Sequence, residues 1–200
     1  MYKTKKLLLT AIVVSAALFS CSKDEGDLSD RPPAYYIAQS EKLEIPAAVD
    51  LPYDPKGHTR VATYFAEGVQ KYKAQQKAGS DPVTYEWVFV APQADLFNIQ
   101  NAFVGTHTAG PSWQLTGGMD SIFAQHFTPS RTAPSPLPNT IDWLLLMPKV
   151  GKTPTGIFAD VDYIQRIATE GGKAPSTLPT SADQTAEVKY IAVYRFTKRN

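Results

Sequence analysis

The densest group of side chains that could do chemistry lies between Val104 and Gly118, a stretch of fifteen residues. It contains His107, Trp113, a proline and four glycines. The imidazole has an ordinary pKa near neutrality, so His107 could act as a general base. The flat indole of Trp113 could stack on a sugar or an aromatic ring, and glycines let the backbone approach a ligand closely.

Three interpretations of this stretch stay open. In a binding pocket, His107 lies exposed at the floor of a concave site, whereas a structural corner buries both His107 and Trp113. An enzyme requires a second reactive group within hydrogen-bond reach of the imidazole. No nucleophile, metal-ligand set or pair of carboxylates can be placed beside His107 from the sequence, so catalysis ranks third.

Gln165 and Arg166 are further candidates, because they are polar residues in an otherwise apolar segment. A buried arginine without a partner is costly, so Arg166 must meet a carboxylate, a group of carbonyls or an anionic ligand. Asp142 and Asp162 are candidate partners for a structural ion pair, and we expect Arg166→Ala to destabilise the fold. The alternative is that Arg166 and Gln165 anchor a ligand in a pocket with His107 and Trp113.

Other site chemistries have little support in the sequence. The three histidines, His58, His107 and His126, are not spaced to share one helix face, so we predict no metal site. Residues 151–153 imitate the end of a phosphate-binding loop, but the first glycine of that motif is missing and Pro154 follows. No dinucleotide fingerprint is present, and we predict no cofactor.

The N-terminus has the pattern of a secretory signal. Three lysines precede an uncharged apolar run, 7–19, which at about thirteen residues is too short to cross a bilayer core that needs about 20. The run ends in Leu18-Phe19-Ser20-Cys21, which is similar to a bacterial lipobox. We therefore predict a lipoprotein signal peptide over 1–20 and lipid attachment at Cys21, the sole cysteine. Ordinary cleavage nearby is the alternative.

Residues 21–41 are predicted to form a disordered acidic tether that links the domain to the membrane. Ser22–Glu25 resembles the acidic export signal of Bacteroidetes surface lipoproteins, and a plain linker is the alternative. The predicted location is the outer membrane, facing either the periplasm or the cell surface. Loss of residues 1–20 changes the formal net charge from +1 to −2, and the basic residues are scattered, which argues against a nucleic-acid partner.

Residues 42–200 are predicted to form a single all-β domain. Apolar alternation indicates strands at 60–66, 69–74, 83–90, 103–107, 113–115, 122–127, 141–147 and 188–197. We expect a hairpin turn at Glu67-Gly68, a strand end at Pro92 and a proline-rich loop over 128–139. Residues 158–169 fit a helix or a strand and stop at Gly171-Gly172. The pattern favours an antiparallel β-sandwich or a partly closed β-barrel, with little helix apart from the signal segment.

Five ordered motifs resemble a family of secreted and envelope proteins, domain of unknown function 3455. They are Gly68–Tyr72 (Gly-Val-Gln-Lys-Tyr), His107–Trp113 (His-Thr-Ala-Gly-Pro-Ser-Trp), Trp143–Leu146, Ile164–Gly172 with Ala174-Pro175, and Tyr190–Phe196. The resemblance runs from about Leu43 to Phe196 and implies no established activity. Members of the family often have cysteines at two positions that correspond to about Ala74 and Leu178. The resemblance therefore implies that one disulfide is lost here and that these two positions lie near each other.

The leading functional hypothesis is a lipid-anchored module that binds a small molecule or glycan through His107, Trp113 and Arg166, with Gln165 beside them. The second is a structural or protein-interaction role at the envelope, for which the sequence names no partner. The third is an enzyme that uses His107 as a base.

Overall fold

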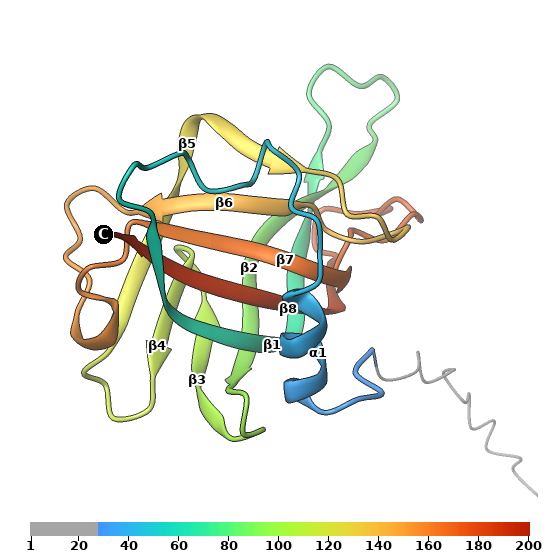
Figure 1. Cartoon of the computed structure of the whole chain (residues 1–200). Helices are drawn as coiled ribbons and strands as arrows, with labels where there is room; N and C mark the ends of the chain where they lie inside the picture. Colours follow the sequence, from blue (N-terminus) through green and yellow to red (C-terminus); the bar gives the residue numbers. More distant parts are fainter. Residues whose placement is uncertain (1–27) are drawn as a thin grey trace, which may run out of the picture.

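The computed structural model describes residues 28–200 and shows a single antiparallel sheet that closes on itself as a ring (Figure 1). The elements are α1 (Pro33–Ser40), β1 (His58–Gln76), β2 (Tyr85–Phe97), β3 (Phe103–Thr108), β4 (Ser112–Leu115), β5 (Ser121–Ala133), β6 (Trp143–Pro148), η1 (Gly156–Phe158), β7 (Tyr163–Gly171) and β8 (Thr185–Arg199). Each strand pairs with its neighbour in the chain, and β8 pairs back with β1. The all-β prediction is confirmed, but the chain forms one closed sheet rather than a two-sheet sandwich.

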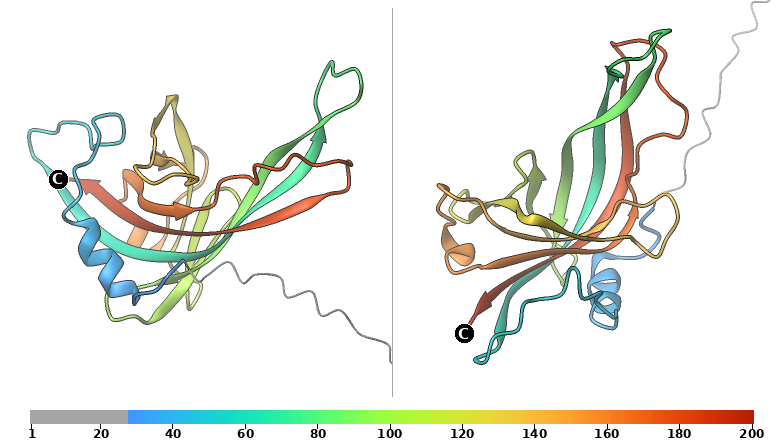
Figure 2. Two further views of the ribbon diagram at one scale, coloured as in Figure 1. Left: turned by 90° about the vertical axis from the view of Figure 1, so that its right-hand side faces the viewer. Right: turned by 90° about the horizontal axis from the view of Figure 1, so that it is seen from above.

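The predicted hairpin at Glu67-Gly68 is wrong, because β1 runs straight through both residues as a single long strand. Gly68 allows this passage: a Cβ placed there would lie 2.1 Å from the carbonyl oxygen of Gln93 on β2. The missing side chain therefore marks a close approach of two strands rather than a turn. Beyond this point β1, β2 and the start of β8 project from the ring as an arm (Figure 2).

Two prolines lie inside strands against expectation: Pro92 was expected to end a strand, and Pro129 was expected in the proline-rich loop. β2 continues past Pro92, which pairs with Gln70, and the register shifts nearby between Lys71 and Tyr72. β5 continues past Pro129, where the register shifts between His126 and Arg131. A β-bulge tolerates a proline because one backbone N–H of the bulge does not donate a hydrogen bond to the neighbouring strand. The proline-rich loop therefore starts after Ala133 instead of at Thr128.

Other expectations agree with the structure. The ambiguous segment 158–169 becomes the end of η1 and most of strand β7, which ends at Gly171. Gly171 and Gly172 both have positive φ, at 65° and 80°, a conformation that glycine adopts without strain. The backbone N–H of Ala74 donates to Gln184, and Trp87, opposite Ala74, donates its indole N–H to the carbonyl of Thr177. The strand end at Ala74 therefore lies beside the loop that contains Leu178, as predicted.

The alternation of strand side chains produces two apolar clusters, one on each face of the sheet. The inner cluster fills the ring around Trp113, Phe158 and Phe196. The outer cluster includes Phe65, Ile191 and Val193, and it is covered by α1. Strand β8 serves both clusters, which explains why its residues 190–197 are all buried. In the described residues no helix is long and apolar enough to cross a membrane.

Helix α1 corrects the predicted extent of the tether, since residues 33–40 fold against the outer face of the sheet instead of remaining disordered. Tyr36 and Ile37 are buried there, and the Tyr36 ring stacks on Phe65 at a centroid distance of 4.9 Å. The adjacent tyrosines Tyr35 and Tyr36 indicated that this segment could pack on the sheet, but the acidic residues before them favoured the prediction of a tether. The prediction for residues 21–27 lies outside the described residues.

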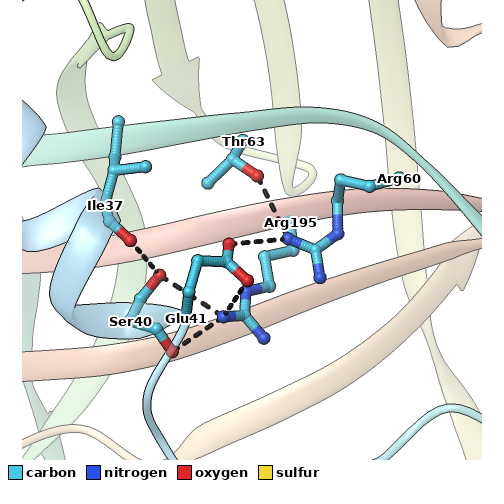
Figure 3. Close-up of polar contacts among 6 residues, drawn as sticks. All are labelled: Ile37, Ser40, Glu41, Arg60, Thr63 and Arg195. Atoms are coloured by element: carbon cyan, nitrogen blue, oxygen red, sulfur yellow. Dashed lines mark hydrogen bonds and ion pairs between the residues drawn. The ribbon is translucent and has the colours of Figure 1, made fainter.

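A polar clasp fixes the end of α1 to the sheet (Figure 3). The Arg195 guanidinium on β8 donates to the backbone carbonyl of Ser40 at 2.7 Å and pairs with the Glu41 carboxylate at 3.1 Å. The other carboxylate oxygen of Glu41 pairs with Arg60 on β1, also at 3.1 Å. Because the Arg195 side chain is only 6% exposed, its charge depends on these partners.

We predict that Glu41→Gln lowers the free energy of unfolding by about 1–2 kcal/mol, because it leaves the buried Arg195 charge with fewer partners. Glu44→Gln is the matched control, since Glu44 is a nearby exposed acid outside the clasp. Urea unfolding of both variants measures the difference. Equal stability of the two variants would show that the clasp contributes nothing.

A candidate binding pocket inside the ring

The strand register gathers polar side chains on the inner face of the ring, at the end that the inner apolar cluster leaves open. His107 on β3 lies between Ala94 on β2 and Trp113 on β4. Arg166 on β7 lies opposite Tyr194 on β8. These residues border a cavity of about 300 Å³, whose lining is Gln70, Phe89, Val90, Pro92, His107, Gly110, Pro111, His126, Leu144, Arg166 and Tyr194.

A second hollow of about 330 Å³ adjoins this cavity. Five residues line both spaces: Gln70, Phe89, His126, Leu144 and Arg166. The second hollow adds Tyr72, Asp142 and Lys173 to the polar lining. Together the two spaces form what we call the ring pocket, with His107 and Tyr194 in its inner part and Lys173 in its outer part.

His107 forms part of the pocket wall and is itself almost fully buried, at 2% exposure. Its ring stacks on Trp113 with a centroid distance of 4.5 Å and an interplanar angle of 7°. Nδ1 lies 2.8 Å from the carbonyl oxygen of Ser112. A carbonyl only accepts, so Nδ1 carries the proton and Nε2 is left as an acceptor.

The pKa of His107 is lowered to about 3, mainly by burial; the hydrogen bond to the Ser112 carbonyl opposes this shift, and the positive charge of Arg166 adds a smaller lowering. The imidazole is therefore neutral at physiological pH, with its single proton on Nδ1. Both His107 and Trp113 are buried, as the structural-corner interpretation requires, with Trp113 at 1% exposure. His107 also borders the cavity, but its side chain is not exposed at the floor as the binding interpretation expected.

The enzyme interpretation gains no support from the surroundings of His107. The hydrogen bond of its ring is to a backbone carbonyl, and its aromatic neighbours are Trp113 and Tyr194. None of the described hydrogen bonds joins the imidazole to a nucleophile or a carboxylate. The described residues also contain no cluster of three or more histidine, cysteine or acidic side chains that could hold a metal ion.

Arg166 does not form the predicted ion pair. Its Nε and Nη2 both donate to the backbone carbonyl of Asp142, at 3.1 and 2.7 Å. Asp162, the other candidate partner, instead pairs with Arg199 at 2.8 Å. The guanidinium therefore keeps a full positive charge that no described carboxylate within 4 Å neutralises. The prediction that Arg166→Ala destabilises the fold stays open, because the two hydrogen bonds to Asp142 would be lost.

The positive charge of Arg166 acts across the whole pocket. Burial raises the pKa of Tyr72, Tyr190 and Tyr194, whereas the charge of Arg166 acts in the opposite direction on all three. Their hydroxyls stay protonated at neutral pH. Tyr72 donates its proton to the carbonyl of Gly172 at 2.6 Å.

Gln165 is not part of the pocket. It lies on the outer face of β7, where its Nε2 donates to the carbonyl of Val49 at 2.9 Å. The side chain is 2% exposed, so it ties the segment before β1 to the sheet. Of the four predicted pocket residues, the structure brings together His107, Trp113 and Arg166 and separates Gln165 from them. Cys21, the predicted lipid attachment site, lies outside the described residues.

Two pocket residues escaped the sequence analysis as site candidates. Gln70 sits in the middle of β1 and is 2% exposed, and its Nε2 is buried without a hydrogen-bond partner in the described residues. Tyr194 is 1% exposed, and its hydroxyl is likewise buried and unpartnered. The alternation in β8 did predict that Tyr190 and Tyr194 share a face. Gln70 gave no signal, because one polar residue in a strand usually points to solvent.

Comparison with known proteins agrees with the motifs around this pocket. A family model described as "Protein of unknown function (DUF3455)" matches residues 99–198, half of the chain. The chain belongs to the DUF3455 family. The match contains four of the five motifs and begins after the Gly68–Tyr72 motif, so the resemblance upstream of residue 99 stays a prediction. No curated protein and no solved structure matches this DUF3455 chain.

The structure gives the His107–Trp113 motif of this DUF3455 protein a physical explanation. The motif is a two-stranded hairpin in which His107 and Trp113 are directly opposite, so their rings stack across β3 and β4. Gly110 lies in the turn with a φ of 132°, where a side chain would be strained. The turn also places Gly110 and Pro111 on the cavity wall.

We predict that His107→Phe flattens the pH dependence of stability. The ordinary pKa is 6.5 and the folded pKa is about 3, so only the unfolded chain takes up this proton between those values. Stability should thus fall as the pH drops from about 6.5 toward 3, by at most about 1.4 kcal/mol per pH unit from this residue. The phenyl ring keeps a stacking surface for Trp113 but does not titrate.

The measurement is urea unfolding of wild type and His107→Phe at several pH values from 4 to 7. His58 and His126 are present in both proteins, so the difference in slope belongs to His107. Identical slopes would mean that the folded imidazole titrates normally and is not held neutral by burial.

Proposed function

We propose that this DUF3455 protein is a lipid-anchored envelope protein that binds a small molecule in the ring pocket. Its inner part has the mixture typical of ligand sites, with apolar walls from Phe89, Pro92 and Leu144 and a few convergent polar groups. Of the candidate residues predicted from the sequence, His107 and Arg166 line the pocket, and Trp113 stacks on His107 without lining it. The cavity of about 300 Å³ could hold a sugar unit of a glycan or another small molecule.

The observation that carries the proposal is the pair of buried polar groups Gln70 Nε2 and the Tyr194 hydroxyl, which, like the Tyr190 hydroxyl beside them, lack a well-placed hydrogen-bond partner in the described residues. Both residues line the cavity and both are nearly inaccessible from outside. Buried polar groups in folded proteins are almost always hydrogen-bonded, because leaving them unpaired costs about 1–3 kcal/mol each. A bound ligand that pairs with these groups would recover this cost.

The anchoring part of the proposal rests on the sequence. The lipobox-like segment before Cys21 and the acidic residues after it favour attachment to the outer membrane, facing either the periplasm or the cell surface. A structural or protein-interaction role is the alternative. The exposed apolar side chains of Phe89 and Val90 would then serve a partner protein, although both also line the pocket.

We expect Leu144→Phe to abolish small-molecule binding, because Leu144 lines both parts of the pocket and a phenyl ring would occupy the space. Ligand-observed NMR with a mixed library of neutral, cationic and anionic fragments measures this directly. Leu178→Phe is the matched control, since it makes the same change at a side chain that is 63% exposed. Fragments that bind both variants equally, or a library without any bound fragment, would contradict a binding function for the pocket.

We further expect Cys21→Ala to abolish incorporation of radiolabelled palmitate when the chain is expressed in a bacterium with a lipoprotein pathway. The thiol is the only cysteine in the chain, so no other residue can replace it in this modification. Ser20→Ala, one residue earlier, should keep the label. Label that persists in Cys21→Ala would contradict lipid anchoring at this site.

A further inference from the structure

We infer that the ligand of the ring pocket is a small organic acid whose carboxylate is held by Arg166. This inference rests on the proposed binding function and specifies the chemical class of the ligand. It follows from three properties of the pocket: an uncompensated positive charge, neutral hydrogen-bond donors beside it, and apolar walls around both.

The first step is the charge. Arg166 is the only lysine, arginine or acidic residue among the described side chains that line the inner part of the pocket. Its Nε and Nη2 are both taken by the carbonyl of Asp142, which holds the guanidinium plane in place. The Tyr194 hydroxyl lies beside the guanidinium, and none of the described ion pairs joins Arg166 to a carboxylate. A guanidinium that is oriented in advance and lacks an acid suits a carboxylate, because less side-chain freedom is lost on binding.

The second step concerns the outer part of the pocket, where other charges lie. Its lining adds one cation, Lys173, and one acid, Asp142, and both of these residues are exposed. These two charges offset each other and are screened by solvent. Arg166 is half-buried and lines both parts, so the charge that a ligand meets inside is positive. A cationic ligand would be repelled there.

The third step is the set of neutral groups. The Tyr194 hydroxyl and the Gln70 amide line the wall that Arg166 shares, and neither has a well-placed hydrogen-bond partner in the described residues, although the Tyr190 hydroxyl lies beside both. Neutral donors around a single cation match the charge of a monovalent carboxylate, which has acceptor sites for several hydrogen bonds. His107 is neutral and adds no second positive charge. The pocket therefore offers less positive charge to balance an anion that carries more than one negative charge.

The fourth step is the apolar wall. Phe89, Pro92 and Leu144 surround the polar groups, and Phe89 is half exposed where the strands widen into the arm. A ligand with only a charged group would leave these side chains in contact with water. An acid with an aromatic or aliphatic body would instead cover them, which adds roughly 25 cal/mol for each Å² of apolar surface removed from water.

The test compares acids with their neutral amides of nearly the same shape. The probes are phenylacetate against phenylacetamide, hexanoate against hexanamide, and inorganic phosphate as an anion without an apolar body. Isothermal titration gives the affinities, and two-dimensional NMR follows the Arg166 Nε–H and Gln70 amide signals to locate the bound probe. The chain is used without residues 1–20 and with Cys21→Ser, because the described fold lies entirely after these positions.

We expect each acid to bind at least tenfold more tightly than its amide and more tightly than phosphate. Arg166→Gln should remove the preference for the acid, and Arg166→Lys should restore part of it. Lys77→Gln, which removes an exposed charge in the arm, should leave the preference unchanged. Because Arg166→Gln could disturb folding, Tyr194→Phe gives a second variant that keeps the charge, and it should weaken the acid more than the amide.

Three outcomes would overturn the inference, and they differ in what they mean for the proposed function. If the amides bind in the pocket as well as the acids do, the pocket is a binding site but not one for carboxylates. If no probe shifts the Arg166 or Gln70 signals at millimolar concentration, both the acid inference and the binding function fail for these chemistries. Tighter binding of phosphate than of either acid would also contradict a ligand with an apolar body.

Discussion

The pairing of β8 with β1 is the constraint on which the rest of the structure depends. It is an extended antiparallel pairing, from His58 opposite Arg199 to Lys73 opposite Thr185, and it closes the sheet. Closure gives every strand an inner and an outer face, because successive side chains in a strand point to opposite sides. In β8 the inner series includes Tyr190, Tyr194 and Phe196, and the outer series includes Ile191, Val193 and Arg195. The same strand therefore builds the dry core, the pocket wall and the clasp for α1.

The two faces are completed in different ways. The outer face would expose a large apolar cluster if the segment before β1 did not cover it, and Arg195, Gln165 and Arg131 all donate to backbone carbonyls of that segment. The inner face is filled at one end by Trp113, Phe158 and Phe196, where η1 contributes Phe158. At the other end the inward positions are Gln70, Arg166 and Tyr194, which cannot form a dry core. The cavity is thus a direct consequence of where polar residues fall in the inward series.

Sequence reasoning succeeded where one periodicity dominated. The aromatic alternation in β8 and the apolar run in β6 gave both strands, because nothing in those segments competes with the strand pattern. It failed at Gly68, Pro92 and Pro129, since a residue that permits a turn also permits a close approach or a bulge, and only the neighbouring strand decides between them. Gln165 and Arg166 could not have shared a site in a regular strand, because adjacent residues face opposite ways. Gln70 was not identified as a site residue, because its surroundings include His126, Leu144 and Arg166 from strands across the ring, which the local pattern of β1 does not reveal.

The stacked pair of His107 and Trp113 explains how a dry core and a polar pocket coexist in one ring. Trp113 contacts Phe196 edge-on at 5.5 Å on the core side, while His107 borders the cavity. A leucine in place of His107 would pack against Trp113, but it could not donate a hydrogen bond to the Ser112 carbonyl. An exposed, charged histidine would bring a cation to the edge of the core. A buried imidazole kept neutral, with one nitrogen committed to the backbone, meets both requirements. The motif therefore lies at the boundary between the dry core and the cavity: both rings are buried as in a structural corner, while His107 also contributes to the cavity wall.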